Sequence, residues 1–318
     1  MNNGSTGSPC PNNTKVGVLM GGVSKEREVS LRSGAAVSKA LQKKGYEVVE
    51  IDVQVGLQGV QKIIDAKIDV AFIALHGRLG EDGAIQGFLE MLRVPYTGSG
   101  VLASALAMDK DFTKQIVHAS GVRTPFWSVV MSGLEEKAIQ EVQSFPVIVK
   151  PAQEGSTIGM SIVKNKEDLM TALKTSFQYD DKVLVEQFIQ GSEVTVSVLN
   201  GKVLPIIQVV PKSGFYDFTS KYTKGMTEYI VPAPISQKLQ ERISLISERI
   251  FDAMSLSGCA RMDFMIDHQE QEYFLEVNTL PGMTETSLVP KAAAATGMSF
   301  EDLCESILQT ASLKEKVA

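Results

Sequence analysis

Carboxylate, amide and guanidinium side chains alternate with apolar residues in two short segments near the C-terminal end of the chain. Asp263 follows Arg261 by two positions in the first segment, and Asn278 follows Glu276 by two positions in the second. Because side chains in a β-strand point alternately to its two faces, each pair shares a face, and the polar turn over His268–Glu270 makes the segments a hairpin. Carboxylate and amide oxygens suit a hard cation such as Mg2+, and an arginine beside them would face an anionic substrate.

The same alternation predicts that Tyr273, Leu275 and Val277 share the opposite, apolar face of the second strand. Taken alone, the segment also fits a hairpin whose polar face is merely solvated. The residues that follow favour a ligand site. Thr279–Gly282 interrupts the strand, its glycine lets backbone N–H groups approach an anion closely, and Ser287 adds a hydroxyl.

A lysine at the end of a buried strand stands beside a glycine- and serine-rich loop in the middle of the chain. Lys150 ends an apolar run, and the loop Glu154–Met160 follows it. Such a pair can cradle phosphates with backbone N–H groups and one ammonium, although a plain hairpin loop is the alternative. The sequence contains no Walker A pattern, so a nucleotide would need a different class of loop. Glu186 and Glu193 could accept hydrogen bonds from adenine and ribose, or be solvated strand acids.

The first part of the chain reads as alternating strands and helices. Lys15–Met20, Tyr46–Val53 and Val70–Leu75 have the apolar character of buried strands. This order predicts a parallel sheet with right-handed crossovers, in which ligands gather at the carboxyl ends of the strands. Glu26 and His76 both follow a strand at that edge, so we expect them to meet, although a single histidine is also common as a structural residue.

Capping residues and periodicity predict the remaining elements. Ser30, Asn165 and Ser299 are expected to cap helices. The other expected elements are helices over Lys110–Ala119 and Gln240–Ser257, a strand over Lys202–Val210, a long aromatic loop over Ser213–Gly225 of the kind that forms lids, and an alanine-rich helix from Lys291.

Composition places the chain among ordinary globular proteins. Its 318 residues predict about two domains, with about three compact subdomains as the alternative. A hydrophobic fraction of 44% excludes chain-wide disorder, and a formal charge of -6 gives no basic footprint for nucleic acid. No apolar run approaches the length of a membrane helix, and the polar segment Met1–Thr14 lacks the apolar core of a signal peptide, so we expect a disordered lead-in on a cytoplasmic protein. Cys10, Cys259 and Cys304 have no CxxC spacing and are expected to be reduced thiols.

Four motif-like runs occur in order along the chain, from about Val16 to Phe300. They are Gly21-Gly22-x-Ser24-x-Glu26-Arg27-Glu28-Val29-Ser30, Leu75-His76-Gly77-Arg78-x-Gly80-Glu81-Asp82-Gly83, Glu154-Gly155-Ser156-x-x-Gly159, and Arg261-x-Asp263 with Glu276-x-Asn278-Thr279-x-Pro281-Gly282-Met283. As an ordered set they resemble the D-alanine–D-alanine ligase family, ATP-grasp enzymes of peptidoglycan synthesis. The resemblance implies an α/β chain with an ATP-grasp fold and an N-terminal parallel-sheet domain.

The implied domains follow from the resemblance and the expected elements together. They are a tail over residues 1–14, an N-terminal α/β substrate domain over 15–108, a central ATP-grasp subdomain over 109–189, and a C-terminal ATP-grasp subdomain over 190–318 that carries the metal and D-alanine sites. The family also implies a homodimer, and neither a nucleic-acid nor a membrane partner is expected.

The resemblance implies a nucleotide site with two Mg2+ ions, for which Mn2+ is a candidate substitute. The implied metal ligands are Asp263, Glu276 and Asn278. The implied ATP contacts are Lys110, Lys150, Ser156 and Lys221 toward the phosphates, and Glu186 and Glu193 toward the adenosine.

The resemblance likewise implies sites for two D-alanine molecules. Glu26 would hold the ammonium of the first, with His76 on the substrate side, and Ser287 with Leu288 would receive the carboxylate of the second. Arg261 and the N–H of Gly282 would stabilise the oxyanion, and Ser156, Tyr222 and Glu26 resemble a hydrogen-bonded triad that closes a lid.

The implied reaction activates one D-alanine as an acyl phosphate, which the amine of the second then attacks. Tyr222 favours the dipeptide over the ester formed with D-lactate, whereas Ala152-Gln153 departs from the Ser or Thr and the frequent Arg expected there. The alternatives are another ATP-grasp carboxylate–amine ligase, a silent nucleotide or amino-acid binder, and a dinucleotide-dependent oxidoreductase. The last would be built on the opening strand–helix–strand unit and would leave the Asp263, Glu276 and Asn278 cluster unexplained. Gly98-Ser99-Gly100 imitates the dinucleotide fingerprint, but it follows Pro95 instead of a clear strand, so this match is weak.

Overall fold

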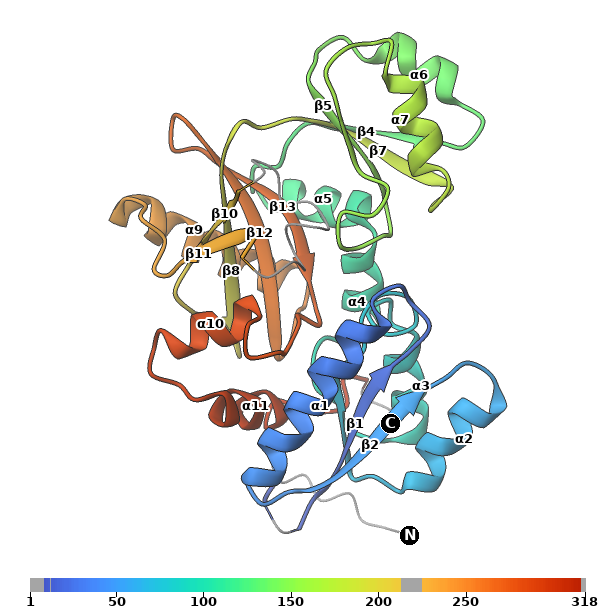
Figure 1. Ribbon diagram of the computed structural model, residues 1–318, viewed down its shortest axis with the longest axis vertical. Coiled ribbons are helices and arrows are strands. Elements are labelled where there is room, and N and C mark those ends of the chain that lie inside the picture. The colour runs from blue at the N-terminus through green and yellow to red at the C-terminus, as the bar shows by residue number, and fades with distance from the viewer. Residues whose placement is uncertain (1–8, 12, 213–224, 316–318) are drawn as a thin grey trace.

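The computed structural model describes residues 9–11, 13–212 and 225–315, and its strands form three sheets (Figure 1). The first sheet is parallel, with strand order β2-β1-β3, which confirms the predicted parallel sheet. Its elements are β1 (Lys15–Gly21), α1 (Arg27–Lys43), β2 (Glu47–Val53), α2 (Leu57–Ala66), β3 (Val70–Ile73) and α3 (Ala84–Leu92).

The predicted start of the first helix is wrong. Helix α1 begins at Arg27, and Ser30 lies inside it instead of capping it. The buried Ser30 hydroxyl accepts a hydrogen bond from the Gly21 N–H at 2.9 Å and donates one to the Ala74 carbonyl at 2.8 Å. Ser30 therefore joins the ends of β1 and β3 to α1 and fixes the loop that carries Glu26.

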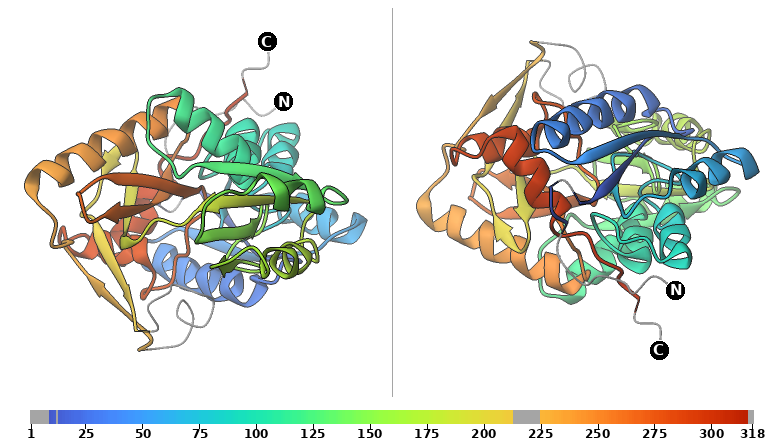
Figure 2. Two further views of the ribbon diagram at one scale, coloured as in Figure 1. Left: turned by 90° about the horizontal axis from the view of Figure 1, so that it is seen from above. Right: turned by 90° about the horizontal axis from the view of Figure 1, so that it is seen from below.

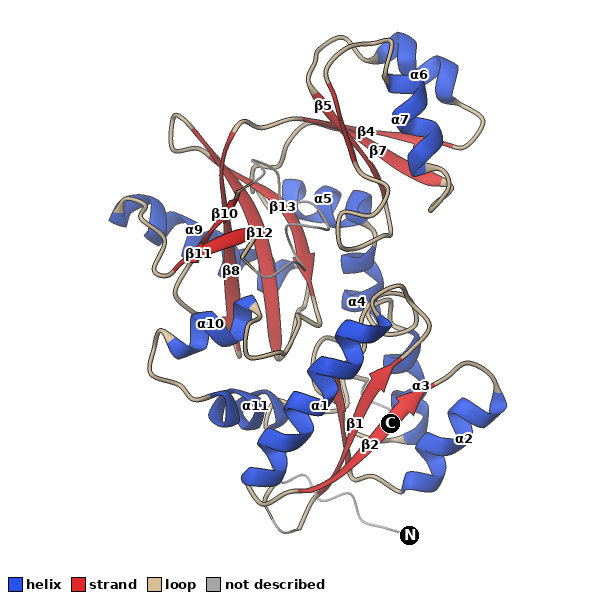
Figure 3. Ribbon diagram, viewed as in Figure 1, coloured by secondary structure: helices blue, strands red, loops and turns tan. Residues whose placement is uncertain are grey.

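Two consecutive helices connect this sheet to the next. They are α4 (Val101–Met108) and α5 (Lys110–Ala119), and the predicted bounds of α5 are confirmed. The second sheet is antiparallel with order β4-β7-β5-β6, and Figure 3 shows α6 and α7 beside it at one end of the molecule. Its elements are β4 (Trp127–Met131), α6 (Glu135–Glu141), β5 (Val147–Pro151), β6 (Ser161–Val163), α7 (Leu169–Ser176) and β7 (Lys182–Gln187).

The second sheet has one apolar face and one face that carries charges. Val147, Val149 and Val185 pack with Leu169 and Leu173 of α7 in a core cluster. Because strand residues alternate, the opposite face carries Ile148, Lys150, Leu184 and Glu186. This is how a buried strand delivers a lysine and a glutamate to a site.

The third sheet has six strands, in the order β11-β10-β8-β12-β13 with β9 paired to β8. Helix α9 packs on it through Leu239, Ile243 and Ile250. Its elements are β8 (Gly191–Leu199), β9 (Lys202–Val203), β10 (Ile207–Pro211), β11 (Thr227–Ile230), α9 (Gln237–Ala253), β12 (Cys259–Asp267) and β13 (Glu272–Asn278), and helices α10 (Leu288–Ala294) and α11 (Phe300–Leu308) follow them.

Four further expectations about element bounds need correction. Asn165 accepts the Asp168 N–H but lies one turn before α7, and α10 begins at Leu288 with Ser287 as its N-cap. Pro205 falls in a break that divides the predicted strand over 202–210 into β9 and β10, because a proline cannot donate to the ladder. Helix α9 starts at Gln237 after the cap Ser236, and it ends four residues before Ser257. The Ser299 cap is confirmed, since its hydroxyl accepts the Asp302 N–H.

A β-bulge changes the predicted faces of the last strand. Asp263 pairs with Glu276, whereas the adjacent Phe264 pairs with Phe274, so Leu275 is the extra residue. Phe274 and Val277 enter the core, and Leu275 lines a cavity together with Glu276. The prediction that Tyr273, Leu275 and Val277 share one apolar face is therefore wrong.

The first sheet and the C-terminal helices share one hydrophobic core. Val16, Val18 and Leu41 pack with Leu303 and Ile307 of α11. Figure 2 shows from below how the red C-terminal helix lies beside the blue N-terminal strands. The two ends of the chain therefore stabilise each other.

Candidate active site

Two adjoining cavities lie where the three sheets approach one another. Their volumes are about 440 Å3 and about 660 Å3, and Lys110, Glu154 and Glu276 line both. The Lys110 ammonium donates a hydrogen bond to the Glu154 carbonyl at 2.6 Å and lies 3.6 Å from a Glu276 carboxylate oxygen. A cation and a carboxylate therefore mark the junction between two separate binding volumes.

The larger cavity lies between the charged face of the second sheet and the end of the third sheet. The predicted ATP contacts Lys110, Lys150, Glu186 and Glu193 line it, and so does Asp263. Apolar side chains line the rest of this cavity, and such a lining suits a ligand that has a planar base and a charged phosphate chain. They include Ile148, Ile158, Met160, Ile189, Met265 and Leu275.

Glu186 sits between two lysines on the floor of this cavity. Its carboxylate lies 2.8 Å from the ammonium of Lys114 and 3.1 Å from that of Lys150. Lys114 is fully buried, also donates to Thr124, and lies over the Trp127 ring; burial lowers the pKa of Lys114 to about 8. The sequence reasoning missed Lys114, although its position one turn after Lys110 in a predicted helix could have indicated it.

The smaller cavity gathers the residues predicted for the amino-acid substrates. Glu26 and His76 come from the first sheet's loops, and Arg261, Gly282 and Ser287 from the end of the third sheet. Leu288 and the metal candidate Asn278 line it as well. The structure thus brings together segments more than 200 positions apart in the sequence.

A hydrogen bond joins the first sheet to the phosphate loop. The Ser156 hydroxyl donates to the Glu26 carboxylate, and a Cβ on Gly155 would lie 3.2 Å from that same carboxylate. Ser156 and Thr157 have left-handed φ angles of 53° and 64°, a strained conformation for residues with a side chain. The loop is therefore held in a special shape against Glu26.

His76 lies at the back of the smaller cavity. Its ring is buried, with Nε2 3.5 Å from the Ser33 hydroxyl. Burial lowers the pKa of His76, whereas the nearby Glu26 carboxylate acts in the opposite direction. The uncharged imidazole is the form that this environment favours at neutral pH.

Glu81 belongs to the motif that contains His76, but no role was predicted for it from the sequence. Its carboxylate accepts the Gly77 N–H at 2.5 Å and lines the smaller cavity. Burial, with a further contribution from Glu26, raises the pKa of Glu81 to about 8. Its place in the motif that follows the strand before His76 was the only sequence signal.

Arg261 and Asp263 form a two-point ion pair on β12. The guanidinium donates to both carboxylate oxygens, at 3.0 and 2.9 Å, and the Thr195 hydroxyl donates to Asp263 at 2.6 Å. Asp263 pairs across the ladder with Glu276, and Arg261 with Asn278. The predicted convergence of two carboxylates, an amide and a guanidinium is therefore present.

The segment after β13 supplies a compact backbone turn. The Asn278 side-chain oxygen accepts the Leu280 N–H at 3.0 Å, and the Ser287 hydroxyl accepts the Thr284 N–H at 3.2 Å. A Cβ on Gly282 would lie 3.2 Å from the Ser287 hydroxyl, so a glycine keeps this corner open.

The oxygen donors fit a divalent cation that shares its coordination with phosphate. Asp263, Glu276 and Asn278 offer carboxylate and amide oxygens at the junction of the cavities. Within the described ranges, no group of three or more His, Cys, Asp or Glu side chains is close enough to hold a metal by itself. Mg2+ is commonly held by one or two carboxylates together with substrate phosphates, so this donor set fits it.

Two predicted site residues, Lys221 and Tyr222, lie outside the residues that the structure describes. Most of the predicted lid over 213–225 lies there as well. Among the described residues, none of the three cysteines forms a disulfide; Cys10 is exposed, whereas Cys259 and Cys304 are buried.

Comparison with known proteins places this geometry in a family. A model described as D-ala D-ala ligase N-terminus matches residues 15–58 and 54–99, and one described as D-ala D-ala ligase C-terminus matches residues 116–309. The chain belongs to the D-alanine–D-alanine ligase family. A D-alanine–D-alanine ligase of Syntrophotalea carbinolica is 55% identical over 301 residues, which cover 95% of this chain and 97% of that protein.

Solved structures of the ligase family agree with this assignment. The crystal structure of the D-alanine–D-alanine ligase from Bacillus anthracis superposes with a TM-score of 0.83 at 38% identity, covering 93% of this chain and 97% of that one. The same enzyme complexed with ATP gives a TM-score of 0.81 at 37% identity, with the same coverage. The predicted ATP-grasp fold with an N-terminal parallel sheet is confirmed.

The structure also shows the surroundings of Gly98-Ser99-Gly100, the run that imitates a dinucleotide fingerprint. No strand precedes the Gly98-Ser99-Gly100 turn directly, because Tyr96 makes only isolated bridges. The turn lies directly before α4, and Gly100 is the N-cap of that helix. Among the described residues, no helix is both long and apolar enough to span a bilayer.

Proposed function

We propose that this chain ligates two D-alanine molecules to D-alanyl-D-alanine for peptidoglycan synthesis, with conversion of ATP to ADP and phosphate. The observation that carries the proposal is the junction of the two cavities at Lys110, Glu154 and Glu276. A phosphoryl group leaving a nucleotide in the larger cavity would emerge there, directly beside a carboxylate bound in the smaller one. Proximity of this kind converts a bimolecular step into a nearly unimolecular one.

The larger cavity would hold ATP. Lys110 and Lys150 pair with its phosphates, as Lys221 would from the lid. Glu186 and Glu193 accept hydrogen bonds from the adenosine. The ammonium groups of Lys114 and Lys150 hold the Glu186 carboxylate in place, where an oxygen can accept from an adenine amine. Ser156 contributes from the phosphate loop.

Asp263, Glu276 and Asn278 would hold two Mg2+ ions, or Mn2+ in their place. When bound, such ions neutralise the charge that develops between the transferred phosphoryl group and ADP. Asp263 keeps its orientation through Arg261 and Thr195, so its carboxylate is already aimed before any ion arrives.

The smaller cavity would bind both D-alanines. Glu26 pairs with the ammonium of the first D-alanine, beside His76. The carboxylate of that D-alanine can then attack the γ-phosphorus of ATP. The product of that attack is D-alanyl phosphate. Ser287 and the first turn of α10 at Leu288 receive the carboxylate of the second D-alanine, where backbone N–H groups at the helix start favour an anion.

The second step forms the peptide bond. The amine of the second D-alanine attacks the acyl carbon, and the guanidinium of Arg261 and the N–H of Gly282 stabilise the resulting oxyanion. One such donor typically contributes about 3–4 kcal/mol to the transition state. The tetrahedral intermediate then expels phosphate and leaves the dipeptide.

The acyl phosphate requires protection from water, which would hydrolyse it. The Ser156–Glu26 hydrogen bond closes one side of the smaller cavity. We propose that Tyr222 completes a triad with these two residues and that the loop over 213–227 acts as the lid.

The assay that tests this function supplies ATP, Mg2+ and D-alanine and measures phosphate and dipeptide. We expect equal amounts of both, no dipeptide from L-alanine, and little ester when D-lactate is added at neutral pH. ATP turnover without dipeptide would indicate another carboxylate–amine ligase, and a predominant ester would contradict the assignment of Tyr222. Absence of turnover would favour a silent binder.

The remaining expectations extend this proposal. The three sheets support subdomains over 15–108, 109–189 and 190–318 behind a tail over 1–14. We further propose that the chain works in the cytoplasm as a homodimer, without a nucleic-acid or membrane partner.

A further inference from the structure

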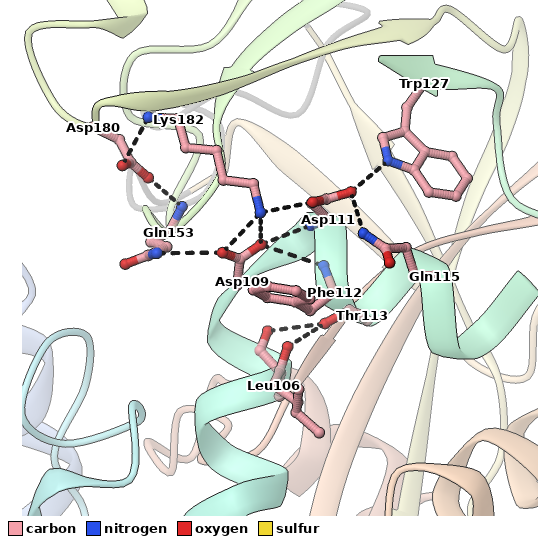
Figure 4. Close-up of polar contacts among 11 residues, drawn as sticks. Leu106, Asp109, Asp111, Phe112, Thr113, Gln115, Trp127, Gln153, Asp180 and Lys182 are labelled. Carbon is pink, nitrogen blue, oxygen red and sulfur yellow. Dashed lines mark hydrogen bonds and ion pairs between the residues drawn. The ribbon is translucent and has the colours of Figure 1, made fainter. Parts of the chain in front are cut away.

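A buried cluster of charges joins helix α5 to the second sheet, outside the residues assigned to substrates (Figure 4). The Lys182 ammonium lies 3.1 Å from the Asp109 carboxylate and 2.7 Å from that of Asp111. Gln153 donates a hydrogen bond from its side-chain amide to Asp109 at 3.3 Å. The side chains of Lys182, Asp109 and Asp111 are 16%, 6% and 10% exposed, so water screens these charges poorly.

The cluster connects three segments that each carry a residue of the cavity lining. Asp109 caps α5 by accepting the Asp111 and Phe112 N–H groups, and the next residue is Lys110. Gln153 directly precedes Glu154. Lys182 starts β7, the strand that carries Glu186.

Backbone contacts make this connection tight. The Lys110 N–H donates to the Ala152 carbonyl at 3.0 Å, and the Ala152 N–H donates to the Lys182 carbonyl at 2.9 Å. The Asp180 carboxylate accepts the Gln153 N–H at 2.8 Å and the Lys182 N–H at 3.1 Å. A shift of Lys182 or Gln153 would therefore move Lys110 and Glu154 relative to each other.

We propose that Gln153, Asp109 and Lys182 form a latch that positions the phosphate loop against Lys110. None of the three latch residues lines either cavity. They act by holding the Lys110 ammonium on the Glu154 carbonyl and, two residues farther, Ser156 on Glu26. This inference rests on the proposed function, because it assigns positioning residues to that reaction.

The charge balance of the latch makes Gln153 its most sensitive member. The Lys182 ammonium faces the carboxylates of Asp109 and Asp111, and the Asp180 carboxylate accepts the backbone N–H of Lys182. The neutral amide of Gln153 donates to this negative group, whereas a carboxylate of equal size there would repel Asp109. Gln153→Glu therefore opposes the latch with almost no change in volume.

The test compares Gln153→Glu and Lys182→Met with two matched controls. Gln143→Glu makes the same change at an exposed glutamine, and Lys174→Met removes an exposed lysine of α7. We expect the latch variants to raise the KM for ATP about tenfold, because a displaced Lys110 or phosphate loop would lose about one hydrogen bond to a charged phosphate. We also expect phosphate to exceed dipeptide, since a displaced loop admits water to the acyl phosphate.

The kinetics of Gln153→Glu and the binding of ADP decide the proposal. Equal phosphate and dipeptide with an unchanged KM for ATP in Gln153→Glu would overturn it, even if the thermal midpoint fell, because a purely structural role moves only stability. If Lys182→Met does not fold, Gln153→Glu decides alone. Calorimetric binding of ADP separates this test from the proposed function: weaker ADP binding by the latch variants supports the latch even if the wild type forms no dipeptide, and unchanged binding in that case overturns it.

Discussion

Glu276 is the residue on which the two cavities depend most directly. It lines both of them and faces Lys110 at 3.6 Å. Glu276→Gln keeps the shape but removes a charged oxygen donor, so we expect kcat to fall by on the order of 100-fold, because metal-assisted charge neutralisation is worth several kcal/mol. Steady-state kinetics with saturating Mg2+ measures this. Glu50→Gln, at an exposed acid of β2, is the control and should match the wild type; a Glu276→Gln enzyme of normal kcat would contradict the metal assignment.

His76 gives a pH dependence whose sign follows from its burial. Its pKa is lowered, so below the ordinary value of 6.5 the unfolded chain binds a proton that the folded protein does not. Stability from the neutral ring is therefore present above the unfolded pKa and is lost as pH falls below it. We expect the stability difference between wild type and His76→Gln to become less favourable to the wild type from pH 7.5 to 5.5. Urea unfolding at both pH values measures it, and the opposite trend would mean that attraction to Glu26 outweighs burial.

The residues found from the sequence differ in kind from those that were missed. Asp263, Glu276 and Glu26 stand in motifs at strand ends, where alternation and topology predict their direction. Lys114 acts from inside a helix against a strand more than 70 positions away. The pairing of Lys114 with Glu186 depends on tertiary packing, so the spacing of neighbouring residues in the sequence does not predict it.

A buried hydroxyl in helix α1, that of Ser30, joins the helix to the ends of β1 and β3. Ser30→Ala would leave the Gly21 N–H and the Ala74 carbonyl without this partner, so we expect a loss of about 1–3 kcal/mol in the free energy of unfolding. We also expect a higher KM for D-alanine, because Glu26 precedes α1. Ser38→Ala is the control: Ser38 lies in the same helix, is buried, and its hydroxyl finds no hydrogen-bond partner among the described residues. Equal losses in both variants, measured by chemical denaturation, would refute this role of Ser30.

Elements were predicted better than their ends. The sequence indicated β1 through a continuous apolar run that is buried along nearly its whole length, and it indicated α5 and the hairpin of β12 and β13 as well. It misplaced the start of α1 because serine can bond within a helix as well as cap it. The bulge at Leu275 was also invisible, since an inserted residue looks like ordinary alternation until the partner strand is known.

The molecule as a whole depends on the core shared by its two ends. Leu303 of α11 is fully buried in the cluster that contains β1 and α1. We expect Leu303→Ala to cost about 3 kcal/mol, the usual loss for a buried leucine, and to destabilise the N-terminal sheet at the same time. Hydrogen exchange on β1 measures the second effect. Leu245→Ala, at a side chain 64% exposed on α9, should change stability little; unaltered exchange in β1 of Leu303→Ala would contradict a shared core.

The central claim is that the two cavities meet so that ATP activates the carboxylate of one D-alanine. D-alanine labelled with 18O in its carboxylate tests it directly, with the released phosphate analysed by mass spectrometry. We expect one labelled oxygen in each phosphate, because the attacking carboxylate oxygen stays on phosphorus when the peptide bond forms. Dipeptide accompanied by unlabelled phosphate would contradict the acyl phosphate and the roles assigned to the junction of the cavities.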